Sequence, residues 1–279
     1  GQNGISPPLI PAITRGPTYP LFLASVYCAS GVPQRLEEWK TVWDRVRTLQ
    51  ALMDGSVCIL LFLVARDLEP RSQKPALIAA SLYAINPYTT YYCRALLAET
   101  VTIFFVAVGL FCVVRSLHSR HHLAFATGAG LALAIATMAR AENLLLGGLL
   151  SLVLLFCAEV GKKAATAATM LTTFILCLTP WTVRTSLLNG QLTLTPVGEV
   201  GYVLYLGSYE TPQNWTDWDV YPAELGFSPQ QLAQLDELTQ QWIEAFQSGL
   251  KEAANYDRVF KELALQRYRS QPLTAVKSW

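Results

Sequence analysis

The stretch Tyr91-Tyr92-Cys93-Arg94-Ala95-Leu96-Leu97-Ala98-Glu99 joins two long apolar runs, residues 75–92 before it and residues 100–114 after it. An arginine and a glutamate therefore lie at the junction of two segments that are apolar enough to cross a membrane. Ionisable side chains at such a depth are energetically costly and usually face a cavity or a partner. We predict that this junction forms the floor of an active site at a membrane surface.

The composition of the chain is that of a membrane protein. Its 279 residues are 52% hydrophobic and only 15% charged, with a mean hydropathy of +0.30, whereas soluble proteins carry about 25% charged residues. A net charge of +1 gives no basic footprint for a nucleic-acid partner. The six cysteines are scattered without a CxxC pair, which predicts buried free thiols and argues against structural zinc.

The apolar runs predict an all-α membrane protein with about six spans, because each run approaches the ~20 residues that cross a hydrocarbon core. We place the spans at about 46–66, 75–93, 97–115, 123–140, 143–159 and 164–183. The apolar segment 17–30 is too short to cross and predicts a half-embedded or surface-lying helix. Residues 35–47 are charged and amphipathic, which predicts a helix along the interface.

Basic turns assign the orientation of the spans. Arginines and lysines gather in residues 66–74, in residues 115–120 and at 162–163, and the positive-inside rule places these turns in the cytoplasm. The histidines at 118, 121 and 122 then lie in a solvated cytoplasmic turn. The opposite face receives the N-terminal loop, residues 94–99, residues 140–143 and everything after Trp181.

This pattern predicts three regions. Residues 1–45 form an outer loop with juxtamembrane helices, residues 46–184 the transmembrane bundle, and residues 185–279 an outer, periplasmic loop and helical segment. In the last region, residues 192–205 predict short strands or an irregular loop, and Ser228-Pro229 predicts a helix start. A further helix is expected over 253–270. The abrupt ends at Gly1 and Trp279 suggest a fragment of a longer chain.

The candidate functional residues fall on the outer face. Single arginines near a membrane surface suit a phosphate, because the guanidinium group keeps its charge and offers forked donors; we assign Arg15, Arg94 and Arg184 to phosphate binding. Glu99 is the candidate catalytic group, as a base, an anchor for an acceptor hydroxyl, or a ligand of a divalent cation. The predicted substrate cavity is lined by Tyr19, Tyr92, Arg140, Glu142, Trp181, Tyr202 and Tyr205.

A purely structural interpretation of these residues is equally simple for each one taken alone. Arginines at helix ends commonly extend toward lipid headgroups, and Arg94 has a pairing partner at hand in Glu99. Trp181 suits the aromatic belt of an interface. The collection of the candidates on one face favours a site over these alternatives.

The order of several motifs resembles polytopic GT-C glycosyltransferases, the relatives of protein O-mannosyltransferases and of the bacterial lipid A aminoarabinose transferase. The segments that carry the resemblance are residues 14–23 (TRGPTYPLFL), 46–52 with 65–68, 92–94 with 97–99, 130–140 (GLALAIATMAR), 180–184 (PWTVR) and 201–207 (GYVLYLG). The resemblance runs in order over about residues 14–207 and thinly through the C-terminal helices.

The resemblance implies a GT-C-type transmembrane bundle with juxtamembrane helices and a C-terminal outer helical segment. It also implies transfer of a sugar from a polyprenyl-phosphate donor to a lipid, glycan or protein acceptor on the outer face of a bacterial inner membrane. Such enzymes use an aspartate in the first outer loop, but this chain has no acidic residue before Glu37. We therefore expect a fragment that lacks the N-terminal span and its aspartate. A complete chain of this kind would lack a catalytic group, whereas a fragment would come from an ordinary transferase.

Two other classes of function stay open. A transporter or flippase of lipid-linked sugars also carries polar groups in its spans, but internal repeats and broken helices near mid-bilayer are typical of such proteins and neither is visible here. A non-catalytic membrane scaffold fits a chain without the aspartate.

Overall fold

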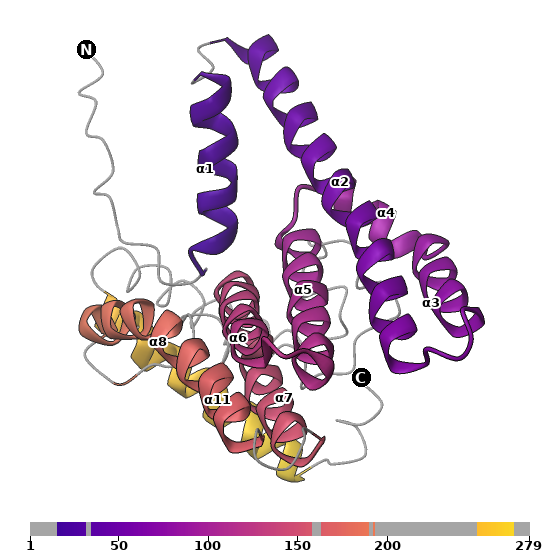
Figure 1. Ribbon diagram of the computed structural model, residues 1–279. Helices are drawn as coiled ribbons and strands as arrows, with labels where there is room; N and C mark the ends of the chain where they lie inside the picture. Colours follow the sequence, from indigo (N-terminus) through magenta and orange to yellow (C-terminus); the bar gives the residue numbers. More distant parts are fainter. Residues whose placement is uncertain (1–15, 32–34, 158–162, 190–191, 193–249, 271–279) are drawn as a thin grey trace, which may run out of the picture. The chain divides into compact units, whose positions relative to one another are not determined.

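The computed structural model describes residues 16–31, 35–157, 163–189, 192 and 250–270 (Figure 1). The chain divides into two compact units, a helix bundle of residues 15–181 and a second unit that combines residues 1–14 with 182–279. Every described element is a helix, which confirms the all-α fold class. The strands or loop predicted over 192–205 and the helix predicted from Ser228 lie outside the described residues, apart from Leu192.

Helix α2 is the central element of the first part of the bundle. It runs from Leu36 to Leu68 and contacts four others, namely α1 (Thr18–Ser30), α3 (Lys74–Ala84), α4 (Pro87–Arg94) and α5 (Ala98–His118) (Figure 1). The interfacial helix predicted over 35–47 and the first predicted span are one continuous helix. No proline or glycine interrupts residues 36–54, so nothing in the sequence ends the helix at the membrane surface.

The span predicted over 75–93 is wrong as a single helix, because the chain breaks it after Ala84. Asn86 has an extended backbone, and its side chain accepts a hydrogen bond of 3.0 Å from the Tyr88 N–H. Pro87 follows at the first helical position of α4, where its missing N–H does no harm. The two short helices α3 and α4 therefore replace one span.

The second part of the bundle packs α5 against α6 (His122–Ala139), followed by a 3₁₀ turn at Ala141–Asn143, α7 (Leu144–Cys157) and α8 (Lys163–Asn189). Its core contains Leu133, Leu154, Met170 and Phe174. Glycines let these helices approach closely: an added Cβ at Gly130 would lie 2.5 Å from the Met170 carbonyl oxygen, and one at Gly147 would lie 2.6 Å from the Phe174 ring.

Four of the described helices are long and apolar enough to cross a membrane, namely those over Glu38–Leu68, Ala98–His118, His122–Ala139 and Ala164–Leu187. The chain is thus a multi-pass membrane protein. The fifth predicted span corresponds to α7, which is apolar but has only 14 residues. In the second unit, α11 (Leu250–Ser270) confirms the helix predicted over 253–270.

Candidate functional site

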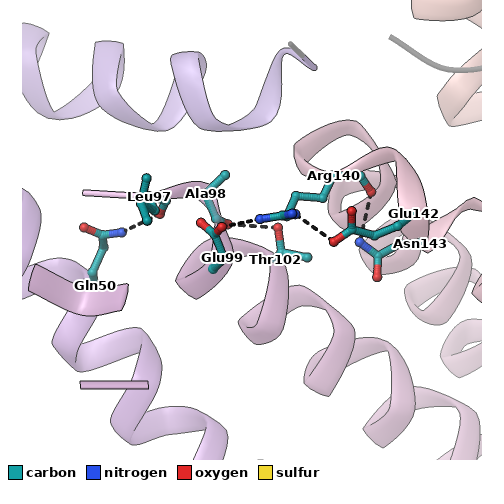
Figure 2. A network of polar contacts seen from close by, with 8 residues as sticks. All are labelled: Gln50, Leu97, Ala98, Glu99, Thr102, Arg140, Glu142 and Asn143. Atoms are coloured by element: carbon teal, nitrogen blue, oxygen red, sulfur yellow. Dashed lines mark hydrogen bonds and ion pairs between the residues drawn. The ribbon is translucent and has the colours of Figure 1, made fainter. Parts of the chain in front are cut away.

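The arginine of the α6–α7 turn lies between two carboxylates at one end of the bundle (Figure 2). Arg140 pairs through Nη1 with the Glu99 carboxylate and through Nε with Glu142 Oε1 at 2.7 Å. Glu99 lies in the first turn of α5, and its side chain is 21% exposed, whereas that of Glu142 is 65% exposed. The sequence separates Glu99 from Arg140 by 41 residues, and the fold brings them into direct contact.

Backbone geometry fixes both partners of this ion pair. Arg140 follows the last residue of α6 in an extended conformation, and its carbonyl oxygen accepts a hydrogen bond of 2.9 Å from Asn143 Nδ2. On the α5 side, Thr102 Oγ1 donates to the Ala98 carbonyl at 2.8 Å. Each helix end is thus held by a local side-chain hydrogen bond, so the carboxylate and the guanidinium group meet in a defined position (Figure 2).

A buried glutamine joins α2 to the start of α5. Gln50 is 0% exposed, and its Nε2 donates to the Leu97 carbonyl at 2.9 Å. The backbone carbonyl oxygen of Gln50 accepts a weak hydrogen bond from Cys93 Sγ at 3.7 Å. Leu96, next to the accepting residue, has a φ of 52°, a left-handed conformation that is costly for a side chain with a Cβ. Gln50 therefore pins a strained connection between α4 and α5.

The N-terminus of α1 docks on the C-terminal end of α6. Thr18 Oγ1 donates to the Ile135 carbonyl at 2.9 Å, and a Cβ at Gly16 would collide with the Met138 carbonyl oxygen. The Tyr19 hydroxyl and Gln50 Oε1 are both buried without a hydrogen-bond partner among the described residues. We call Tyr19, Gln50, Glu99, Arg140 and Glu142 together the Glu99 cluster.

Electrostatics in the Glu99 cluster favour a charged arginine and a neutral tyrosine. Burial alone lowers the pKa of Arg140, but the Glu142 and Glu99 carboxylates outweigh burial and raise its pKa above the ordinary value. Burial raises the pKa of Tyr19 to about 12, and the charges of Tyr27 and Glu99 act in the same direction. The Glu99 cluster therefore holds one guanidinium charge, shared by two carboxylates, beside an un-ionised phenol.

The opposite end of the bundle contains a second ion cluster. Asp67, near the end of α2, lies 3.0 Å from Arg115 Nε and 3.7 Å from Arg66 Nη2. The Arg115 guanidinium group also lies 5.4 Å from the centre of the Phe111 ring. Asp67, Arg66 and Arg115, here called the Asp67 cluster, connect the last turns of α2 and α5.

The predicted site residues are only partly gathered. The structure brings together Tyr19, Glu99, Arg140 and Glu142. The Arg94 side chain is exposed and lies apart from the Glu99 cluster in a cleft with Tyr91, whose ring is 5.8 Å from that of Tyr92. Arg184 and Trp181 belong to the last turns of α8, with Arg184 in the second unit. Arg15, Tyr202 and Tyr205 lie outside the described residues.

The sequence pattern did not indicate two residues of this region, Gln50 and Arg47, as functional candidates. Gln50 is one amide in an otherwise apolar run, and that isolation was the only signal. Arg47 was hidden in the amphipathic segment 35–47, where charged residues are expected. For the proposed divalent cation, the described residues contain no group of three or more histidine, cysteine, aspartate or glutamate side chains placed to hold a metal.

Comparison with known protein families gives a match for this chain. A family model described as GPI transamidase subunit PIG-U matches residues 17–197, which is well over half of the chain. No curated protein sequence and no solved structure matches significantly.

This match corrects the predicted activity. The prediction of a GT-C glycosyltransferase is wrong, because the matched family is that of a subunit of GPI transamidase, a protein-modifying complex. The coarser part of the resemblance holds: the family is polytopic, membrane-embedded and of the GT-C-like class. Motif order therefore identified an architecture and not a reaction, which is a common outcome when one fold serves many functions.

Proposed function

Because the chain belongs to the family of the GPI transamidase subunit PIG-U, we propose that it is a non-catalytic membrane subunit of such a transamidase. In this role the bundle anchors the complex in the bilayer, and the Glu99 cluster forms a rigid polar platform at its surface. The platform supports the other subunits and the lipid-linked substrate. The proposal adopts the membrane scaffold among the alternatives that the sequence left open, in place of sugar transfer.

The observation that carries the proposal is the pairing of Arg140 with both Glu99 and Glu142. A general base needs a carboxylate that is free to take a proton from its substrate. The Glu99 carboxylate is instead engaged by the Arg140 guanidinium group, so it is not free to accept a proton from a substrate. An ion pair of this kind suits the fixing of helix ends better than proton transfer.

The cysteines of the bundle also support a non-catalytic role. Transamidation through a covalent intermediate needs a nucleophile with an adjacent base. Cys93, the cysteine nearest the Glu99 cluster, is buried, donates to the Gln50 carbonyl and accepts from Thr100 Oγ1 at 3.8 Å. No described cysteine hydrogen-bonds to a histidine. This supports a catalytic centre located on another subunit.

The remaining assignments are proposals within this role. Arg15, Arg184, Trp181, Tyr202 and Tyr205 are proposed to contact the substrate or a neighbouring subunit. Membrane lipids and the other subunits replace the sugar donor and acceptor as the expected partners.

Charge-removal variants test the proposal in cells that lack the protein. Glu99→Gln and Arg140→Gln are each expected to lower the amount of chain that co-purifies with the other transamidase subunits. Arg140→Gln leaves the shielded Glu99 without a cation, and Glu99→Gln leaves Arg140 with the exposed Glu142 alone. The double variant restores co-purification, since no unpaired charge remains on Glu99 or Arg140. Activity for each assembled complex stays at the wild-type level in all three.

An exposed glutamate away from the Glu99 cluster supplies the control. Glu69→Gln removes an exposed carboxylate that accepts a hydrogen bond of 3.3 Å from the backbone N–H of Arg71, and it is expected to change neither readout. The proposal fails if Glu99→Gln assembles normally and abolishes transfer of the GPI anchor, because Glu99 would then take part in the chemistry.

A further inference from the structure

A cleft between α2 and α4 contains two arginines that the proposed function does not use. It has a volume of about 680 Å³ and is lined by Arg47, Thr90, Tyr91, Arg94 and Ala95. None of these residues belongs to the Glu99 cluster. We call this site the arginine cleft.

Arg47 is held in place by contacts on both sides of the arginine cleft. Its Nε donates to the Arg94 carbonyl at 3.3 Å, and its Nη1 donates to Asp44 Oδ1 at 3.0 Å. The side chain thus bridges α2 and α4, which distinguishes it from an arginine that extends freely toward headgroups. Two anchoring bonds use two of the five N–H donors of a guanidinium group, so the others stay available to a ligand.

The positive charge of Arg94 is not offset by any of the described residues. Its side chain is exposed, and its guanidinium group makes no hydrogen bond or ion pair with any described residue. Asp44 offsets the charge of Arg47. The arginine cleft therefore has a positive excess, in contrast to the Glu99 cluster, where carboxylates outnumber the arginine.

The depth of the arginine cleft matches a lipid headgroup. Arg94 and Ala95 end α4 a few residues before the candidate span Ala98–His118 begins. Arg47 lies one helical turn before Gln50, whose side chain bonds the Leu97 carbonyl at the start of that span. Both arginines thus lie at the level where hydrocarbon gives way to headgroups, and there the phosphate is the anion that every phospholipid presents.

The other lining residues suit the polar group attached to such a phosphate. Tyr91 is 61% exposed and lines the cleft, and its side chain carries an aromatic ring and a hydroxyl. Thr90 is exposed beside it and adds a hydroxyl that donates and accepts. Guanidinium groups bind phosphate oxygens with forked N–H donors, which adds geometric selectivity to charge.

We propose that the arginine cleft is a binding site for the phosphate of a lipid headgroup, held by the Arg94 and Arg47 guanidinium groups with Tyr91 against the attached polar group. The ligand is a phospholipid of the surrounding bilayer or the phosphate-containing lipid substrate, because both present the same phosphate. The site itself does not depend on the proposed function; only the second source does.

Native mass spectrometry of the full chain in detergent tests the site, with phosphatidylinositol as the probe. Arg94→Gln and Arg47→Gln are each expected to weaken binding about tenfold, the usual effect of losing a charge-assisted hydrogen bond. Arg94→Lys keeps the charge and loses the fork, so it falls between wild type and Arg94→Gln. Diacylglycerol, with the same chains and no phosphate, binds weakly to every variant.

The matched control is Arg45→Gln, two residues from Arg47 on the same helix and lining a different groove, with Ser25 and Val26 of α1. It is expected to bind phosphatidylinositol like the wild type. Thermal melting shows whether each variant is folded, and Arg94 is the informative position because its exposed guanidinium group makes no hydrogen bond or ion pair with a described residue. Wild-type binding by a folded Arg94→Gln, or equal binding of diacylglycerol, overturns the proposal.

A second arm identifies the source of the phosphate. Tighter binding of a glycosylphosphatidylinositol than of phosphatidylinositol, lost in Arg94→Gln, assigns the site to the substrate. Equal and equally Arg94-dependent binding of both assigns it to a bilayer lipid. Either result sustains the site, and both are independent of the co-purification experiment, so failure here is distinguishable from failure of the proposed function.

Discussion

The two ends of the helix bundle hold ion clusters of the same design and opposite sign. In the Glu99 cluster one arginine lies between two glutamates, and in the Asp67 cluster one aspartate lies between two arginines. Both clusters connect α5 to a neighbouring element at the limit of an apolar segment. The first cluster therefore has an excess of negative charge and the second an excess of positive charge.

This comparison shows that arginines near a membrane surface can have different roles, which depend on whether a carboxylate pairs with them. Arg140 is neutralised by its neighbours, and Arg115 shares Asp67 with Arg66. Arg94 lies at the same end of α5 as Glu99 but pairs with no described residue, so its charge is available to a ligand. Counting arginines on one face therefore overestimates the number of phosphate contacts, and the pairing decides which of them qualify.

Truncating the two arginines compares the clusters most directly and should give the largest effect. Arg140→Ala leaves Glu99 and Glu142 unpaired, with Glu99 largely shielded from water. The expected loss of stability is about 2 kcal/mol, between the values for buried and for surface pairs, since the Arg140 side chain is 36% exposed. Arg115→Ala should cost about 1 kcal/mol or less, because Asp67 keeps Arg66.

Thermal unfolding of the detergent-purified protein measures both losses. The membrane-level packing of α5 against α6 is common to the two variants, so the difference between them reports the clusters. Equal destabilisation would mean that the Asp67 cluster depends on Arg115 as strongly as the Glu99 cluster depends on Arg140, and the proposed asymmetry would be wrong.

Two buried polar residues, Gln50 and Ser116, extend the comparison between the two ends of the bundle, with a smaller expected loss of stability. Gln50→Leu removes an interhelical hydrogen bond and leaves the Leu97 carbonyl unsatisfied, with an expected loss of about 1.5 kcal/mol. Ser116, near the Asp67 end, is equally buried but donates to Val113 within its own helix at 2.6 Å. Ser116→Ala should therefore cost less, because an i−3 bond of this kind connects no second element. A larger loss for Ser116→Ala in chemical unfolding would contradict the idea that Gln50 joins α2 to α5.

These contrasts also show what the sequence could and could not reveal about the fold. The Asn86-Pro87 pair carries a cap and a helix breaker, so the interruption of the span predicted over 75–93 was readable in advance. The continuity of α2 was readable too, from the lack of glycine and proline over 36–54. Hydropathy alone did not reveal the interruption, because a hydropathy value averages over the window that contains the break.

For the candidate site, the sequence placed residues on a face and could not pair them. Topology put Glu99, Arg140 and Glu142 on one side of the membrane, but the choice of Arg140 over Arg94 as the partner of Glu99 depends on helix packing. Gln50 gave almost no signal, since one amide in an apolar run looks the same whether it is buried or lipid-facing. The reaction was misjudged because the motifs shared with GT-C enzymes describe the bundle.

The junction between α4 and α5 allows a finer test of the Glu99 end. Leu96→Ala and Leu96→Gly remove the same leucine contacts apart from the Cβ, so their difference isolates the left-handed backbone at a φ of 52°. The glycine variant should be the more stable by about 1 kcal/mol, because it has no Cβ to clash in that conformation. No such strained residue occurs near the Asp67 cluster within the described residues, so the strain is a property of the Glu99 end. Equal melting temperatures for the two variants would show that the junction relaxes in solution.

The smallest expected effect is a pH dependence that only the Glu99 end should show. Tyr19 lies in α1, outside the four candidate spans, and its pKa rises from the ordinary value of 10.0 to about 12 in the folded protein. Between these pH values the unfolded chain releases a proton that the folded chain retains, so the stability gained from a neutral Tyr19 is complete below pH 10 and declines as the pH rises. Tyr19→Phe cannot ionise and should lose less stability than the wild type over this window, measured as the difference in melting temperature at each pH. Because the Tyr19 ring is only half-buried, the difference should be small, and parallel curves for the two proteins would place the hydroxyl in water, away from Gln50 and Glu99.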